Sequence, residues 1–346
     1  MNFKTYGRLN NIIGWVVFAI AAIVYLSTME RTVSLWDCGE FVSSAYKLQV
    51  PHPPGAPFFL LVYRFFAMLA PTPADVPIMT NGASALCSAF TILFLFWTIT
   101  SMAQRLILKD TENLSKENVY GVFAAGIIGG LAYTFSDTFW FSAVESEVYA
   151  MSSMFTALVF WLVLKWERRA DQPYSMRWIV LIFFLVGVVI GVHLLGLLVI
   201  PVVVLIYYFK KYKNITPLGT VIAIVIGLAS LALVQFFTIL TLPSIASKFD
   251  LTFVNSFGLP LWSGVIFFFV LLIALLVGGI IWSQLKGKFY LNVGLSCYLA
   301  VILGYTCYTT SVIRSLANPT IDMNDPENVF SYNSYLSREQ YGDNYL

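Results

Sequence analysis

The sequence is poor in charge and in cysteine, and each shortage excludes a class of protein. Charged residues make up 11% of the chain, less than half of their share in water-soluble proteins. The formal net charge is only +2, so the chain lacks the basic surface that binds a phosphate backbone, and we expect no nucleic-acid partner. The four cysteines lie far apart, a pattern that fits neither a disulfide framework nor a zinc site.

The abundant residues are apolar, at 59% of the chain. Their runs reach the roughly 20 residues needed to cross a bilayer core. The stretch 178–209 is apolar except for His193 and lies between two basic clusters, which predicts two short helices that turn near Gly191 and His193. We therefore expect an all-α integral membrane protein with about nine transmembrane helices: 12–28, 82–104, 119–136, 148–166, two within 178–209, 217–241, 260–282 and 292–313.

The basic residues predict which side each loop faces. Residues 57–70 are apolar but short, with Arg64 near their middle, which suits a juxtamembrane helix better than a span. If they do not cross and the N-terminus is cytoplasmic, 14 of the 20 basic residues lie inside, as the positive-inside rule requires. A crossing would reverse this asymmetry. The resulting topology has a long external first loop and places 13 of the 18 acidic residues outside.

No internal repeat or soluble linker divides the apolar part of the chain. We expect one transmembrane domain over residues 1–317. Residues 318–346 turn polar and aromatic, and we interpret them as an external tail that begins a C-terminal region continuing beyond Leu346.

The first external loop carries Asp37 and Glu40, which share a face if the segment is helical. One of them could act as a general base on a hydroxyl; alternatively both are solvated beside an interfacial helix. A divalent cation could bridge the pair, since it prefers oxygen ligands, but nothing in the spacing requires a metal. His52 follows in a proline-rich bend over 50–57, where it either binds an anion or hydrogen-bonds to the loop.

The second external loop contains Asp137, Glu145, Glu147 and Tyr149. Residues two apart on a helix point in different directions, so we expect one of the two glutamates to face a cavity and the other to face water. The helix dipole at a nearby N-terminus is a purely structural alternative for either acid.

Three basic residues on the predicted external face are candidates to bind a lipid phosphate. His193 lies in an apolar turn, where it either packs with a satisfied partner or binds the phosphate. Arg64 and Arg314 flank apolar runs, where arginines either extend toward the interface or bind lipid headgroups.

The order of these motifs resembles the GT-C membrane glycosyltransferases, among them protein O-mannosyltransferases and aminoarabinose transferases. More specifically, it resembles a bacterial family formerly described as a domain of unknown function, glycosyltransferase family 117, which is grouped with a eukaryotic protein O-mannosyltransferase. The resemblance rests on Trp36-Asp37-x-x-Glu40-Phe41, His52-Pro-Pro-Gly55, Glu145-Ser-Glu147-Val-Tyr149, Gly191-Val-His193-Leu-Leu, and Asn318-Pro-Thr-Ile-Asp322 to Arg338-Glu-Gln-Tyr-Gly342.

The resemblance implies a GT-C-like fold in a bacterial inner membrane and inverting transfer on the periplasmic face. It implies a polyprenyl-phosphate-linked sugar as donor and a hydroxyl of a secreted or envelope protein as acceptor. The family's base falls on Asp37 or Glu40, and the choice stays open because relatives often have adjacent acids there. His193 stands where relatives place a lysine or histidine near the lipid phosphate. We assign substrate binding to His52, Arg64, Asp137, Glu145, Glu147, Tyr149, His193 and Arg314.

Two other functions stay open. A carrier or flippase could use Glu145, Glu147 and His193 as a proton relay, although these residues lie in loops and not at mid-helix positions. A non-catalytic scaffold of an envelope complex would need none of them.

Overall fold

A computed structural model describes residues 2–108 and 114–342. Within these ranges the regular structure is helical, and the one isolated β-bridge joins Val50 to Asp322. Seven helices are long and apolar enough to cross a membrane, or eight if the bent pair α5 (Lys116–Thr134) and α6 (Asp137–Ala143) is one span. The predicted all-α integral membrane class is confirmed, while the count of nine crossings stays a prediction.

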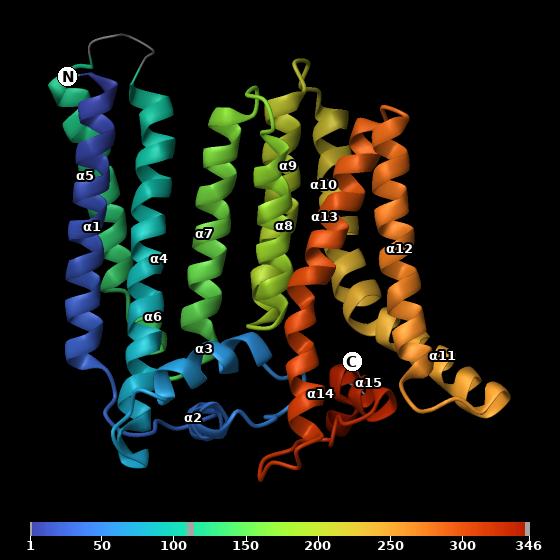
Figure 1. The fold of residues 1–346 in the computed structure, drawn as a ribbon. Helices are drawn as coiled ribbons and strands as arrows, with labels where there is room; N and C mark the ends of the chain where they lie inside the picture. The colour runs from blue at the N-terminus through green and yellow to red at the C-terminus, as the bar shows by residue number, and fades with distance from the viewer. Residues whose placement is uncertain (1, 109–113, 343–346) are drawn as a thin grey trace. The chain divides into compact units, whose positions relative to one another are not determined.

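The chain divides into two compact units, residues 1–46 with 62–168 and residues 47–61 with 169–346. In the first, α1, α4 and α5 pack side by side (Figure 1). Besides α5 and α6, its elements are α1 (Phe3–Thr28), α2 (Cys38–Lys47), the end of α3 (Pro57–Ala67), η1 (Pro73–Asp75), α4 (Val76–Ile107) and α7 (Val148–Arg169).

Small residues bring the helices of the first unit close together. A Cβ at Gly126 of α5 would lie 2.6 Å from Thr100 of α4, and one at Gly130 would lie 3.3 Å from Val17 of α1. Apolar burial drives no association between helices in lipid, so this close backbone approach supplies the dispersion contacts that hold them. Buried aromatic rings fill the remaining space, including those of Tyr25 and Phe96.

The helix α3 has 11 residues, too few for the roughly 20 that a span requires. A short helix is thus present within 57–70, while its place at the membrane interface stays a prediction. Its Arg64 is half-buried and donates to the main-chain carbonyl of Tyr46, in the last turn of α2.

The second unit contains the remaining helices, and two of them cross through a pair of glycines. A Cβ at Gly187 of α8 would lie 2.2 Å from the Val301 carbonyl oxygen of α13, and one at Gly304 of α13 would lie 2.4 Å from the Phe184 carbonyl oxygen. The two backbones are therefore in direct contact. The elements are α8 (Met176–Ile190), η2 (Leu194–Leu198), α9 (Val199–Lys211), α10 (Pro217–Ala232), η3 (Leu233–Thr241), α11 (Leu242–Phe257), α12 (Ser263–Leu285), α13 (Phe289–Tyr305), η4 (Thr306–Tyr308), α14 (Thr309–Ser315), α15 (Val329–Ser337) and η5 (Glu339–Tyr341).

The predicted turn near Gly191 and His193 is confirmed. Helix α8 ends at Ile190, η2 begins at Leu194, and α9 follows it directly. The Gly191 carbonyl oxygen accepts hydrogen bonds from the backbone of Phe58 at 2.8 Å and of Phe59 at 3.2 Å, so this turn contacts the start of α3.

The polar tail packs inside the second unit. The Val50 amide donates to Ile321 at 3.0 Å, and the hydroxyl of the buried Tyr335 donates to the Pro51 carbonyl at 2.7 Å. These contacts attach the described part of the tail to the proline-rich bend. The predicted division at residue 317 stays a prediction.

Candidate functional site

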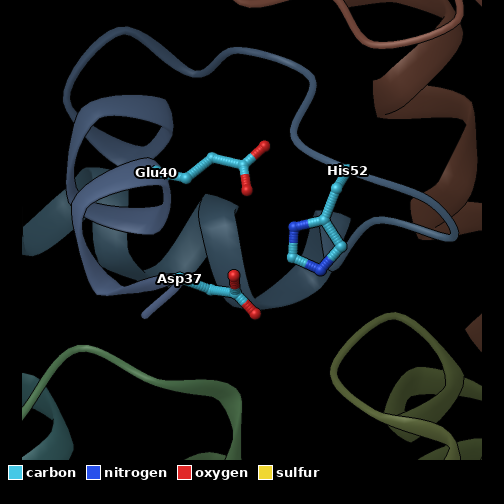
Figure 2. A group of neighbouring side chains, drawn as sticks. All are labelled: Asp37, Glu40 and His52. Carbon is cyan, nitrogen blue, oxygen red and sulfur yellow. The ribbon is translucent and has the colours of Figure 1, made fainter. Parts of the chain in front are cut away.

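Asp37 and Glu40 lie together at the start of α2 in the first unit. The Phe41 amide donates to the Asp37 carbonyl at 2.9 Å, so Asp37 stands directly before the first helical residue and Glu40 follows within one turn. A carboxylate oxygen of each lies within 4.8 Å of the other, and both carboxylates point to the same side (Figure 2). Asp37 is exposed and Glu40 half-buried. The pair also offers the oxygen ligands that suit a hard divalent cation.

Trp36 directly precedes the Asp37–Glu40 pair in the chain. Its backbone has φ 65°, a left-handed conformation that non-glycine residues adopt rarely and that costs of the order of 1–3 kcal/mol. Its side chain is 85% exposed. A large exposed ring beside a polar loop is typical of the membrane interface.

Cys38, between the two acids, joins α2 to the second predicted loop. Its side chain is buried and hydrogen-bonds to Glu145. Burial, followed by the nearby charges of Glu145 and Glu147, raises the pKa of the Cys38 thiol to about 12. The thiol is therefore a neutral donor, which excludes it as a nucleophile near pH 7.

Glu145 and Glu147 are both buried, with exposed fractions of 5% and 7%. The expectation that one faces water is wrong, because the segment is not helical. The Glu147 amide donates to the Glu145 carbonyl at 2.9 Å, which closes a three-residue turn at Ser146. The Glu147 carboxylate accepts from the Val148 amide at 2.8 Å, at the start of α7. The unit thus contains an exposed acid, Asp37, a half-buried one, Glu40, and two buried ones, Glu145 and Glu147. We call these four residues the acid cluster.

Asn81, in the second turn of α4, holds the two loops in place. Its Nδ2 donates to the carbonyls of Glu30 at 2.8 Å and Thr32 at 3.2 Å, and its Oδ1 accepts from Ser146. The Glu30 amide in turn donates to Val144 at 2.9 Å. One buried amide therefore fixes both the segment before α2 and the turn before α7.

Arg64 and Tyr63 support the same region from α3. Arg64 donates to the Tyr46 carbonyl, and its guanidinium lies 5.9 Å from the Tyr46 ring centre. The Tyr63 side chain is fully buried, and its hydroxyl lies 2.5 Å from the Ser84 hydroxyl of α4. Arg64 thus caps the C-terminal end of α2, which is a structural use of a residue predicted to bind substrate.

Asp137 and Tyr149 occupy exposed positions in the first unit. Asp137 begins α6 and Tyr149 lies in the first turn of α7, with 46% of its surface exposed. Both are accessible to a ligand outside the buried acid cluster.

His52 belongs to the second unit and is drawn in Figure 2. It is half-buried, and its carbonyl accepts from the Gly55 amide at 2.9 Å. Gly55 has φ 72°, and a Cβ there would lie 2.3 Å from the Tyr335 hydroxyl. Glycine is therefore required for this bend.

His193 directly precedes η2, and its Nδ1 accepts from the Leu195 amide at 3.3 Å. Burial, followed by the charge of Arg338, lowers the pKa of His193. The imidazole is therefore neutral near pH 7, and the positive charge beside it belongs to Arg338.

Arg314, at the end of α14, binds the chain and not the solvent. Its Nε donates to the Leu48 carbonyl at 2.6 Å and its Nη2 to the Lys47 carbonyl at 3.3 Å. Like Arg64 in the first unit, it satisfies main-chain acceptors.

Four supporting residues were not predicted: Cys38, Tyr63, Asn81 and Ser146. Two had a signal in the sequence. Asn81 is a polar residue at the start of a long apolar helix, and Cys38 stands between the two predicted acids. The roles of Tyr63 and Ser146 depend on tertiary contacts alone.

Comparison with known proteins finds a family whose match covers most of these residues. Residues 37–216, just over half of the chain, match the family described as "Protein O-mannosyl-transferase TMEM260 N-terminal domain". The chain is 29% identical over 151 residues to "Protein O-mannosyl-transferase TMEM260" of Mus musculus, and 28% identical over 153 residues to "Protein O-mannosyl-transferase tmem260" of Dictyostelium discoideum. No solved structure matches significantly.

Each of these two alignments covers 44% of this chain and less than a fifth of the relative, 19% for the first and 17% for the second. The family match begins at Asp37 and includes every residue of the acid cluster.

Proposed function

Because the chain belongs to the family of the protein O-mannosyl-transferase TMEM260 N-terminal domain, we propose that it is a membrane glycosyltransferase. The donor is a polyprenyl-phosphate-linked sugar, and the acceptor is a serine or threonine hydroxyl of a secreted or envelope protein. The observation that carries the proposal is the Asp37–Glu40 pair, with carboxylate oxygens within 4.8 Å, backed by the buried acids Glu145 and Glu147.

The proposed reaction is a single displacement at the anomeric carbon. Asp37 accepts the proton of the acceptor hydroxyl as its oxygen forms a bond to that carbon. The bond between the anomeric carbon and the phosphate oxygen breaks, and the polyprenyl phosphate leaves from the opposite face, which inverts the configuration. Glu40 orients Asp37 or the acceptor. If a divalent cation binds, the carboxylates of Asp37 and Glu40 would hold it, and it would supply positive charge at the site.

Asp37 is the better base because it is exposed, whereas Glu40 is half-buried. The accessible Asp137 and Tyr149 are suited to contact the sugar. In the second unit, Arg338 is better suited than the neutral His193 to carry charge for a phosphate. Arg314 and Arg64 act through the backbone segments that they hold.

The test is transfer by purified variants in lipid. Asp37→Asn removes the basic site and keeps the size, so transfer should fall by about 10²–10⁴ with donor binding unchanged. Glu117→Gln, at an exposed acid in the first turn of α5, is the matched control. Near-normal transfer by Asp37→Asn with loss in Glu40→Gln would make Glu40 the base. Normal transfer by both would overturn the mechanism and direct attention to the acids of 137–147.

The alternative function is a proton-relay carrier that would use the same acids. The purified protein in lipid can distinguish this carrier from a transferase. A carrier would move a substrate across sealed vesicles without forming a glycosidic bond, whereas the transferase yields a glycosylated peptide detectable by mass spectrometry.

We further propose that the N-terminus is cytoplasmic and that the acid cluster faces the periplasm of a bacterial inner membrane. Asp75 is the last residue of η1, directly before α4, and Lys116 is the first residue of α5, the helix after α4. Asp75→Cys and Lys116→Cys should react with an impermeant thiol reagent from opposite sides. Reaction of both from one side would contradict this topology.

A further inference from the structure

The first unit has a polar cavity at the end of its helices far from α2. It measures about 370 Å³. Matching faces of two helices line it, with residues at positions i, i+4 and i+7 on each, and the first turns of α1 close it. These residues are Trp97, Ser101 and Gln104 of α4 and Trp161, Lys165 and Arg168 of α7.

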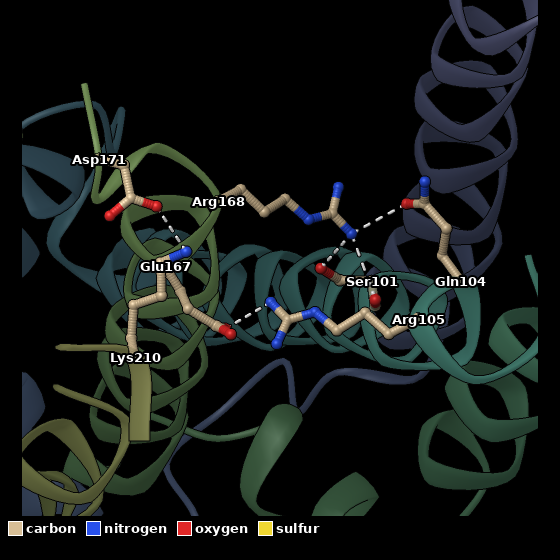
Figure 3. A network of polar contacts seen from close by, with 7 residues as sticks. All are labelled: Ser101, Gln104, Arg105, Glu167, Arg168, Asp171 and Lys210. Atoms are coloured by element: carbon tan, nitrogen blue, oxygen red, sulfur yellow. Dashed lines mark hydrogen bonds and ion pairs between the residues drawn. The ribbon is translucent and has the colours of Figure 1, made fainter. Parts of the chain in front are cut away.

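The charged residues that line this cavity are both cations, Lys165 and Arg168. Arg168 is held in place: its Nη2 contacts the Ser101 carbonyl at 3.2 Å, the Ser101 hydroxyl at 2.7 Å and Gln104 Oε1 at 2.9 Å (Figure 3). The neighbouring acid, Glu167, is paired with Arg105 at 2.5 Å. Positive charge is therefore concentrated at the cavity.

The aromatic wall is also ordered. Trp97 and Trp161 stack with ring centres 5.0 Å apart, and the Lys165 ammonium lies 4.0 Å from the Trp161 ring centre. Stacked rings beneath a cation fix the position of its charge.

Two buried polar atoms beside the cavity have no hydrogen-bond partner within the described ranges, Trp97 Nε1 and Asn10 Oδ1. Such atoms are rare in proteins and point to a polar group supplied from outside. The cavity has unfilled space next to Gly7 of α1, where an added Cβ would meet nothing within 4 Å.

We propose that this cavity binds the phosphate group of an anionic phospholipid headgroup. The helices α1, α4 and α7 are candidate spans, so their ends lie at headgroup level. Arginine and lysine bind phosphate oxygens, and tryptophan prefers this depth. Trp97 and Asn10 line the cavity and each keeps one buried polar atom without a hydrogen-bond partner within the described ranges, which suits a polar ligand. The site is separate from the Asp37 cluster and from its reaction.

The probe is short-chain phosphatidylglycerol added to the full chain in neutral detergent, with binding measured by native mass spectrometry and by the shift in thermal unfolding. Gly7→Leu fills the cavity without changing charge, and Lys165→Gln removes one cation. Each should weaken phosphatidylglycerol binding at least tenfold. The matched control is Gly121→Leu on α5, where an added Cβ also meets nothing within 4 Å but which does not line the cavity.

Three outcomes would overturn the proposal. The first is undiminished phosphatidylglycerol binding by Gly7→Leu. The second is equal binding of phosphatidylcholine, whose headgroup has no net charge. The third is an equal thermal shift with inorganic phosphate alone, which would assign the cavity to a soluble phosphate. If Gly7→Leu fails to fold, the Lys165→Gln comparison decides by itself.

Discussion

Asn81 and Ser146 are joined by a hydrogen bond from the serine hydroxyl to the amide oxygen, 65 residues apart in the chain. The same amide binds the carbonyls of Glu30 and Thr32. One side chain of α4 therefore determines where the loop before α2 meets the turn before α7. The relative positions of the acids before α2 and before α7 therefore depend on the Asn81 contacts.

Asn81→Leu should lower the free energy of unfolding by about 2–3 kcal/mol, because it leaves a buried hydroxyl and two carbonyls without partners. Denaturation by SDS in mixed micelles measures this. Asn118→Leu changes an exposed asparagine of α5 and should have little effect. Equal stability of the two variants would show that the Asn81 contacts are dispensable.

Cys38 should resist alkylation. A thiol with a pKa of about 12 stays protonated at pH 8, so its thiolate fraction is ~10³-fold below that of an ordinary cysteine. Iodoacetamide should label Glu117→Cys, at an exposed position of α5, at least that much faster. Glu145→Gln removes a charge that raises the pKa, so it should speed the labelling of Cys38. Rapid labelling in the unmodified chain would contradict the burial described here.

Gly187→Ala should destabilise the protein by about 1–3 kcal/mol, because the new methyl group would overlap the Val301 carbonyl of the opposing helix. Gly278→Ala on α12 is the matched control, since a Cβ there meets nothing within 4 Å. The control should be neutral or stabilising by up to about 1 kcal/mol through helix propensity. Thermal unfolding of both variants in the same detergent gives the comparison, and a harmless Gly187→Ala would refute the close crossing.

His193 should titrate below pH 6.5, because burial and Arg338 lower its pKa. Since the unfolded state then binds the proton more readily, this residue makes stability fall as pH drops from 6.5 toward its folded pKa. The chain has only two histidines, so NMR of labelled imidazole can follow both, with His52→Gln for assignment. Arg338→Gln should raise the pKa of His193. A value at or above 6.5 that this change leaves unaltered would contradict the account.

The sequence allowed the helical membrane class to be predicted, because apolar length is a local property. It also predicted that Asp37 and Glu40 would share a face and that the chain would turn near His193. In each case the deciding feature was spacing within a short segment. The assumption of helical spacing gave the wrong orientation for Glu145 and Glu147, because these residues lie in a non-helical turn.

The arginines show the other limit. An arginine beside an apolar run looks the same in the sequence whether it binds a lipid phosphate or a main-chain carbonyl. Arg64 binds Tyr46, 18 residues away, and Arg314 binds Leu48, 266 residues away. Such partners are set by the tertiary fold, so only the structure could identify them.

Trp36 has a consequence for the order of events in the proposed transfer. If its exposed ring inserts into the membrane interface, the proposed base Asp37, which follows it, lies at the same depth. An acceptor hydroxyl would then have to reach a point beside the lipid surface. A compact folded domain buries most of its chain and cannot bring an interior serine to that point, whereas a chain just emerging from translocation can. In the proposed reaction, modification would therefore precede the folding of the acceptor and compete with its folding rate.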